Sequence, residues 1–120
     1  NRVTPNYNVM GVAKAALESA TRYLANDLGP QQIRVNAISP GPVRTLAGAG
    51  ITDARFMYAF QKDHAPLRRP VTHQGIGGTA LYLVSELSCD TTGEIMYVDA
   101  GYNIISMPRP ENLKMPGSEA

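Results

Sequence analysis

Residues 34–45 read RVNAISPGPVRT, and this stretch decides the fold. The segment over residues 33–39 is short and largely apolar, which is typical of a strand in a parallel sheet whose two faces are both covered. The residues from Pro40 to Thr45 are rich in proline and glycine and carry a hydroxyl group. They therefore predict a tight loop that leaves the end of the strand.

A helix is expected before this strand. Apolar residues recur at three- and four-residue steps over residues 8–28, which predicts an amphipathic helix that packs inward through this apolar stripe. Thr4-Pro5-Asn6 provides a start signal and Gly29-Pro30 a stop signal. The stripe consists of Val9, Val12, Ala13, Ala16, Leu17, Ala20, Leu24 and Leu28.

Further elements are expected after the loop. They are a helix over residues 45–64 that Gly48 and Gly50 interrupt, a linker over 65–70, a helix over 72–87, a turn over 88–93 and a strand over 94–98. Thr72 is the expected N-cap of the second of these helices. From Met107 onward, prolines and charges predict a tail over 107–120 that is extended or disordered.

The order helix, strand, helix, strand predicts an α/β fold with a right-handed parallel crossover. Two strands do not make a stable sheet by themselves, because the first strand would present an apolar edge to water where a neighbour should pair with it. We therefore expect the chain to be incomplete as a folding unit, or to complete itself with another chain.

The composition argues against several classes of function. Eleven Lys and Arg stand against ten Asp and Glu, so the net charge of +1 indicates neither a nucleic acid nor an anionic membrane surface as partner. The single cysteine, Cys89, cannot form an internal disulfide, which suits a reducing cytosol. No apolar run approaches the ~18 residues of a membrane span. His64 and His73 have no partner at metal-ligand spacing, so we expect two surface histidines and no metal site.

Tyr7 and Lys14 are the strongest candidates for chemistry. A helix turns by about 100° per residue, so a step of seven returns to within about 20° of the starting direction and climbs about 10.5 Å. The two side chains therefore share a face, and Gly11 leaves a gap between them where a flat ring could approach. Lys14 could bind a cofactor hydroxyl while Tyr7 donates to a substrate oxygen. The alternative is a solvated lysine beside a half-buried tyrosine.

The segment from Asn6 to Lys14 resembles the short-chain dehydrogenase/reductase superfamily and, within it, the bacterial enoyl-acyl-carrier-protein reductases. Ordinary members of the superfamily carry the lysine four residues after the tyrosine, where this chain has Gly11, whereas the enoyl reductases carry it seven residues after. The resemblance continues through residues 29–30, 34–47, 66–69, 92–94 and 98–102, and it extends to about Met107.

The resemblance implies that residues 1–106 are the C-terminal half of a Rossmann-type domain, a doubly wound parallel sheet of which the last two strands, their flanking helices and a substrate lid are present. In that family NADH delivers a hydride to a trans-2-enoyl thioester. Tyr7 would then stabilise the enolate, and Lys14 would hold the nicotinamide ribose. Pro42, Val43 and Thr45 would lie along the carboxamide and pyrophosphate of the cofactor.

The substrate and assembly are likewise implied by the resemblance. The substrate would be an enoyl thioester of acyl carrier protein in type II fatty-acid synthesis, and Ala47, Gly48 and Ile51 would line its acyl channel. The protein would be a cytoplasmic bacterial enzyme and a homotetramer, with the helix over residues 8–28 packed across a two-fold interface.

Two of the family's features fall outside the sequence. Its glycine-rich phosphate loop and a further active-site tyrosine would both precede Asn1. We therefore expect the 120-residue chain alone to be inactive and to bind no stoichiometric NADH. The alternative function is that of a truncated, non-catalytic remnant that only associates with an intact copy.

Overall fold

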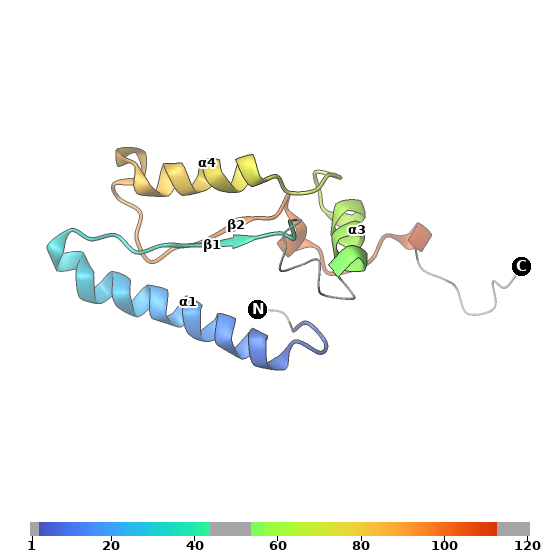
Figure 1. Ribbon diagram of the computed structural model, residues 1–120, viewed down its shortest axis with the longest axis horizontal. Coiled ribbons are helices and arrows are strands. Elements are labelled where there is room, and N and C mark those ends of the chain that lie inside the picture. Colours follow the sequence, from blue (N-terminus) through green and yellow to red (C-terminus); the bar gives the residue numbers. More distant parts are fainter. Residues whose placement is uncertain (1–2, 44–53, 113–120) are drawn as a thin grey trace, which may run out of the picture. The chain divides into compact units, whose positions relative to one another are not determined.

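The computed structural model describes residues 3–43 and 54–112. Its helices and strands are α1 (Asn8–Leu28), β1 (Ala37–Pro40), α3 (Ala54–His64), α4 (His73–Val84) and β2 (Ile95–Val98), and short 3-10 helices occupy Gly29–Gln31, Glu86–Ser88, Tyr102–Ile104 and Pro110–Asn112 (Figure 1). The described residues form two compact units, which are treated separately. The first contains residues 3–39 and 77–96, and the second contains residues 40–43, 54–76 and 97–112.

β1 and β2 form a two-stranded parallel sheet. The backbone N–H of Ala37 donates to the carbonyl of Glu94 at 2.9 Å, and that of Gly41 donates to Val98 at 2.9 Å. The same sequence offset in both bonds means that the strands run in one direction. The predicted α/β fold with parallel strands is therefore confirmed, and the described part of the chain contains the last portion of a Rossmann-type sheet.

The first strand is shorter than predicted, because residues 33–36 do not join the ladder. The N–H of Val35 donates instead to Oγ1 of Thr92 at 3.0 Å. Nδ2 of Asn36 donates to the carbonyl of Thr91 at 3.0 Å, and Oδ1 of Asn36 accepts from the N–H of Glu94 at 3.1 Å. Where the two chain segments first meet, these side-chain bonds accompany a single backbone bond, from the N–H of Gly93 to the carbonyl of Val35 at 2.7 Å.

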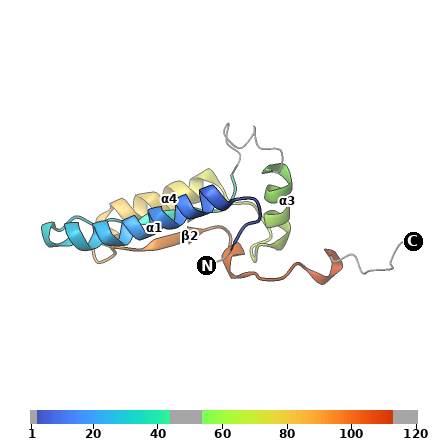
Figure 2. The same cartoon turned by 90° about the horizontal axis from the view of Figure 1, so that it is seen from below.

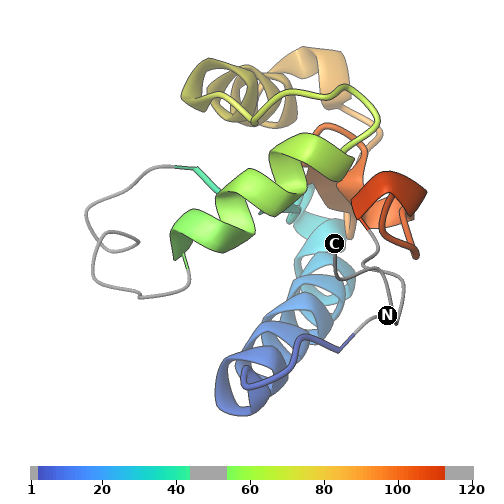
Figure 3. The same cartoon turned by 90° about the vertical axis from the view of Figure 1, so that its right-hand side faces the viewer.

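In the first unit, α1 and the part of α4 from residue 77 onward lie on opposite sides of the strands (Figures 1 and 3). Thr21 and Ala25 are the buried residues of α1. A Cβ added at Gly93, in the loop before β2, would lie 3.5 Å from Cβ of Ala25, so helix and loop are in close contact. The apolar stripe predicted to pack inward is instead exposed, with Val9 at 83% and Val12 at 72% exposure. Periodicity detected an amphipathic helix but not which of its faces meets the sheet.

α1 ends at Leu28, as the stop signal Gly29-Pro30 predicted, but Gly29 does not adopt the left-handed conformation common at the end of a helix. Gly29 is right-handed, with φ −56°, and it leads into a 3-10 turn that contains Pro30. Gln32 adopts the left-handed conformation instead, with φ 62°. Its N–H donates to Gly29 at 2.8 Å and the N–H of Ile33 donates to Leu28 at 3.3 Å, which closes a Schellman motif one turn later than expected.

Thr72 is confirmed as the N-cap residue before α4, because its Oγ1 accepts from the N–H of Gly75 at 2.9 Å. The helix ends at Val84 and not at Leu87. Ser85 is extended, with φ −96° and ψ 166°, and its hydroxyl donates to the carbonyl of Tyr82 at 2.8 Å. The serine side chain therefore satisfies a terminal carbonyl of the helix and begins the 3-10 turn Glu86–Ser88.

Aromatic contacts hold α3, the green helix of Figure 2, within the second unit. The ring of His64 stacks on Phe60, with centroids 3.9 Å apart, and Tyr102 meets Phe60 edge-on at 6.4 Å. His64 is only 3% exposed, so its prediction as a surface residue is wrong. A step of four residues along α3 aligns Phe60 and His64, and Tyr102, 42 positions further on along the chain, covers the pair.

The segment after β2 is a tight turn built on Asp99. Its carboxylate accepts from the N–H of Gly101 at 3.0 Å and from the N–H of Asn103 at 2.8 Å. Further on, Arg109 and Glu111 form an ion pair beside the 3-10 helix Pro110–Asn112. The Glu111 backbone N–H and then Arg109 lower the pKa of the Glu111 carboxyl. The tail predicted over residues 107–120, extended or disordered, stays a prediction.

Candidate active site

Tyr7 lies at the first junction of α1 and not inside the helix. It is the N-cap residue, with φ −121° and ψ 24°, and its carbonyl accepts the first helical hydrogen bond from the N–H of Gly11 at 2.6 Å. The preceding Asn6 has φ 61°, which turns the chain sharply into the helix. The tyrosine side chain is 43% exposed. The start of α1 therefore fixes the backbone that carries the phenol.

Lys14 is exposed and lies on the same helix. Tyr7, Lys14 and Thr21 form a row at intervals of seven, and each step changes direction by only about 20°. Thr21 is 5% exposed, on the side of α1 that packs in the first unit. Tyr7 and Lys14 therefore occupy the N-terminal, uncovered part of the packing face, and not the opposite face as the sequence suggested.

The gap at Gly11 is adjacent to the Tyr7 ring. A Cβ at Gly11 would lie 3.9 Å from Cδ1 of Tyr7, in ordinary van der Waals contact, so the glycine leaves the ring edge uncovered. Within residues 3–43 and 54–112, no carboxylate forms a salt bridge with Lys14, and neither its ammonium nor the Tyr7 hydroxyl has a recorded hydrogen bond. A phenol, an ammonium group and an open gap suit a ligand with a flat ring and hydroxyl groups.

Pro42 and Val43 follow β1 in the second unit and are both half-buried. The chain at Gly41 is tightly enclosed, because a Cβ there would lie 2.8 Å from Cγ2 of Val71 and 3.2 Å from Cα of Asp99. This close contact fixes the beginning of the loop, as the sequence predicted from its glycine and prolines.

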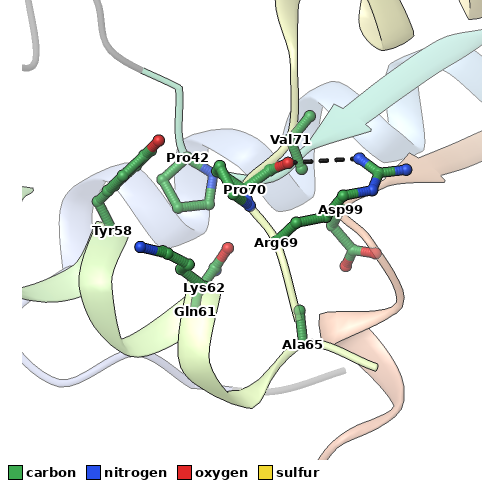
Figure 4. Close-up of a pocket in the computed structure, with 9 residues that line it drawn as sticks. All are labelled: Pro42, Tyr58, Gln61, Lys62, Ala65, Arg69, Pro70, Val71 and Asp99. Carbon is green, nitrogen blue, oxygen red and sulfur yellow. Dashed lines mark hydrogen bonds between the residues drawn. The ribbon is translucent and has the colours of Figure 1, made fainter. Parts of the chain in front are cut away.

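A small pocket in the second unit lies beside this loop (Figure 4). Tyr58 and Lys62 of α3 line it together with Pro42, and Arg69 donates to the carbonyl of Pro70 at 3.4 Å on another side. The free volume of this pocket, about 10 Å³, has room for a single water molecule. The pocket is therefore too small for a nucleotide or an acyl chain.

The remaining predicted site residues, Thr45, Ala47, Gly48 and Ile51, lie outside the described residues. The structure thus places Tyr7 at the N-cap of α1, Lys14 within α1, and Pro42 and Val43 next to each other on the loop after β1. In the described part of the chain, no group of three or more His, Cys, Asp and Glu could hold a metal ion. None of the described helices has the length and apolar character that a bilayer crossing needs.

A polar clamp in the first unit was not evident from the sequence. The Arg34 guanidinium donates to Oγ of Ser88 at 2.8 Å and to the carbonyls of Ser85 and Thr91 at 3.2 and 3.3 Å. These bonds tie the segment before β1 to the connection between α4 and β2. The sequence feature that could have indicated this clamp is an arginine at the start of an otherwise apolar predicted strand.

Comparison with known proteins decides the family. A family model described as "Enoyl-(Acyl carrier protein) reductase" matches residues 1–103. The chain belongs to this family. The enoyl-[acyl-carrier-protein] reductase [NADH] 2 of Rhizobium meliloti (strain 1021) is 63% identical over 118 residues, which cover 98% of this chain and 44% of the relative. The FabI protein of Rickettsia typhi is 60% identical over 104 residues, which cover 87% of this chain and 40% of the relative.

Solved structures of enoyl reductases give the same result. The enzyme of Anaplasma phagocytophilum in complex with NAD superposes with a TM-score of 0.84 at 56% identity, over 91% of this chain and 42% of that one. The Bacillus cereus enzyme with NADP⁺ and indole naphthyridinone superposes with a TM-score of 0.85 at 52% identity. The match covers 88% of this chain and 41% of that one. The chain thus matches the C-terminal part of the enoyl reductase fold and spans well under half the length of these relatives.

Proposed function

We propose that this chain supplies the tyrosine–lysine half of the active site of an NADH-dependent enoyl-acyl-carrier-protein reductase. The reaction would convert a trans-2-enoyl thioester of acyl carrier protein to the saturated acyl thioester in type II fatty-acid synthesis. One observation carries the proposal: Tyr7, the N-cap residue of α1, and Lys14, seven residues further on within α1, are both exposed in a member of the enoyl reductase family. When bound, NADH supplies the hydride.

Lys14 is the proposed cofactor-binding group. Its ammonium carries three donors and is exposed, and no carboxylate within the described residues pairs with it. It can donate to the hydroxyls of the nicotinamide ribose while its charge raises the local positive potential. The uncovered gap at Gly11 leaves space for the flat nicotinamide ring beside Tyr7.

Tyr7 is the proposed catalytic residue. Its phenol donates a hydrogen bond to the thioester oxygen, which gains negative charge as the hydride reaches the β-carbon. A donor aimed at this oxygen stabilises the enolate more than the substrate, and so accelerates the reaction. Because the Tyr7 backbone is fixed by the bond from Gly11, the phenol keeps its position relative to Lys14.

The other assignments complete this proposal. Pro42, Val43 and Thr45 would contact the carboxamide and pyrophosphate of NADH, and Ala47, Gly48 and Ile51 would line the acyl channel. The assembled enzyme would be a cytoplasmic bacterial homotetramer. Exposed apolar residues of α1, such as Val9 and Val12, support α1 as an element of its two-fold interface.

A chimaeric enzyme tests the proposal. The part of the R. meliloti relative that precedes the matched stretch is fused to this chain, and NADH oxidation is followed with a crotonyl thioester. We expect turnover, which Tyr7→Phe abolishes and Tyr23→Phe does not, since Tyr23 is a second exposed tyrosine of α1. A folded chimaera without turnover, or equal losses in both variants, would exclude the assigned role. It would leave the non-catalytic remnant as the better account.

A further inference from the structure

The residues just before α1 form a tight turn that leads into Tyr7. Pro5 and Asn6 are the central residues of this turn, and Asn6 has φ 61°, in the left-handed region. Proline followed by a residue with positive φ is the combination that favours a type II turn, and asparagine is one of the few residues other than glycine that enter this region. The chain therefore reaches Tyr7 along a path that most residue types at position 6 would disfavour.

Asn6 contributes its backbone conformation and not a side-chain contact. The residue is exposed, and within residues 3–43 and 54–112 its side chain forms no hydrogen bond. Neither packing nor a polar interaction thus accounts for an asparagine at this position. The left-handed turn does account for it.

Tyr7 depends on this turn because the start of α1 holds it only from one side. Tyr7 occupies the N-cap position, yet among the described residues no side-chain cap hydrogen bond forms there. The N–H of Gly11 donates to the Tyr7 carbonyl, which fixes the C-terminal side of the residue. The rotamers open to a side chain depend on φ and ψ, and Tyr7 has φ −121°, far from the helical value of about −63°. The turn at Asn6 holds the chain at this angle.

We propose that Asn6 is a positioning residue for the Tyr7 phenol. Its left-handed backbone sets the approach of the chain to the helix, and so the aim of the phenol at the thioester oxygen. This role rests on the proposed function, in which Tyr7 donates to that oxygen. Lys14 lies within α1, about two helical turns further on, where the hydrogen bonds of the helix hold its backbone. Asn6 should therefore affect the chemical step and not cofactor binding.

Substitutions at Asn6 in the chimaeric enzyme test this role. Asn6→Val places a β-branched residue where φ is positive, which is strongly disfavoured, so the turn should change and the phenol should shift. We expect kcat to fall by about tenfold or more, while the Kd for NADH in a fluorescence titration stays within about twofold of the parent. Asn6→Gly should keep kcat within about threefold of the parent, since glycine adopts positive φ freely.

Gln32 provides a matched control at the other end of the same helix. It has φ 62° and is exposed, like Asn6, but it lies beyond the C-terminal end of α1. Gln32→Val carries the same backbone conflict and should lower the urea midpoint, as Asn6→Val does, yet it should leave kcat within about twofold of the parent. Equal kcat values in the two valine variants, or an Asn6→Gly enzyme as slow as Asn6→Val, would overturn the positioning role.

Crystal structures of the chimaeras provide a readout that does not depend on turnover. Relative to Lys14, the phenol should move by about 1 Å or more in Asn6→Val and stay in place in Asn6→Gly. If Asn6→Val does not fold, Asn6→Ala takes its place with the same expected direction of change, because alanine meets a smaller steric conflict at positive φ. An unmoved phenol would overturn the role of Asn6.

The two proposals fail separately. If Tyr7→Phe and Tyr23→Phe had equal effects on turnover, the proposed function would be lost, while the place of the phenol in the crystal structures would still decide the role of Asn6. If Tyr7→Phe abolished turnover and the valine variants at positions 6 and 32 had the same kcat, the function would stand and Asn6 would have no positioning role.

Discussion

The guanidinium of Arg34 donates a hydrogen bond to Oγ of Ser88 at 2.8 Å across 54 positions of sequence. Ser88 is 2% exposed, and its hydroxyl also donates to the carbonyl of Leu83 at 2.9 Å. One hydroxyl thus joins the segment before β1 to the end of α4. Because the partners of Arg34 are neutral oxygens, this clamp depends on geometry and not on an ion pair.

Replacing Ser88 by alanine should lower the free energy of unfolding by about 1.5–3 kcal/mol, since the variant leaves a charged donor without its shortest bond. Urea denaturation followed by circular dichroism measures the change. Ser106→Ala, at an exposed serine, serves as the control and should stay within about 0.5 kcal/mol of the parent. Equal effects of the two substitutions would show that the clamp contributes nothing.

Gly101→Ala should destabilise the protein by about 3 kcal/mol or more. Gly101 has φ +87°, and its added Cβ would lie 2.8 Å from Cγ of Pro66. Gly93→Ala is the matched comparison: Gly93 has φ +73°, but its Cβ would have ordinary contact at 3.5 Å with Ala25. Gly93→Ala should lower the free energy of unfolding only by the cost of placing alanine in a left-handed backbone conformation, about 1–2 kcal/mol. Thermal unfolding that ranks Gly93→Ala as the worse variant would contradict this account.

Gly77→Ala should stabilise α4 by about 0.5–1 kcal/mol, because alanine favours the helix and its Cβ would meet nothing within 4 Å. Gly75→Ala should gain less or lose stability. Its Cβ would lie 3.1 Å from Oγ1 of Thr72, the group that caps the helix. Urea midpoints of both variants check the order, which would be refuted if Gly75→Ala were the more stable.

Lys14 and Tyr7 should affect different kinetic constants in the chimaeric enzyme. Lys14→Ala should raise the KM for NADH by about tenfold or more, since it removes a charged contact to the cofactor. Tyr7→Phe should lower kcat and leave the KM for NADH within about twofold, because it removes a bond made mainly in the transition state. Arg22→Ala, an exposed cation on the same helix, is the control. If Lys14→Ala left both constants unchanged, its role in cofactor binding would be wrong.

The 120-residue chain alone should show no saturable NADH binding in a fluorescence titration. Under the proposed function, Lys14 and the loop at Pro42 and Val43 would contact only part of a dinucleotide, and we expect the free-energy cost of immobilising the ligand to exceed the binding energy of these contacts. Saturation at one equivalent of NADH would show that the chain holds a complete cofactor site.

Elements with strong local signals were predictable. The bounds of α1 match the predicted residues 8–28, because the periodicity is long. The N-cap at Thr72 was predictable because the residue type and the helix start coincide. For the site, the sequence pattern placed Lys14 within the helix, whereas Tyr7 is the N-cap residue just before its first residue, and the roles of both stay a prediction.

Features that depend on distant partners were not predictable from local patterns. β1 begins only at Ala37, and the preceding Asn36 bonds through its polar side chain to Thr91, 55 positions away. His64 is buried because Phe60 and Tyr102 surround it. The packing face of α1 runs through Thr21 and Ala25, two small residues, and Ala25 lies close to Gly93. A prediction from hydrophobicity alone instead chose the larger apolar residues of the other face as the packing face.

The contact between Ala25 and Gly93 has a mechanical consequence. Ala25 lies about 16 Å from Lys14 and about 27 Å from Tyr7 along the axis of α1, so a tilt of the helix at this contact would be magnified at its N-terminal end. A tilt of about 5° at Ala25 would swing the ammonium by about 1.4 Å and the phenol by about 2.4 Å. Errors of that size disrupt reactive alignment. Under the proposed function, the methyl group of Ala25 would therefore influence the alignment of the Tyr7 phenol and the Lys14 ammonium from a distance.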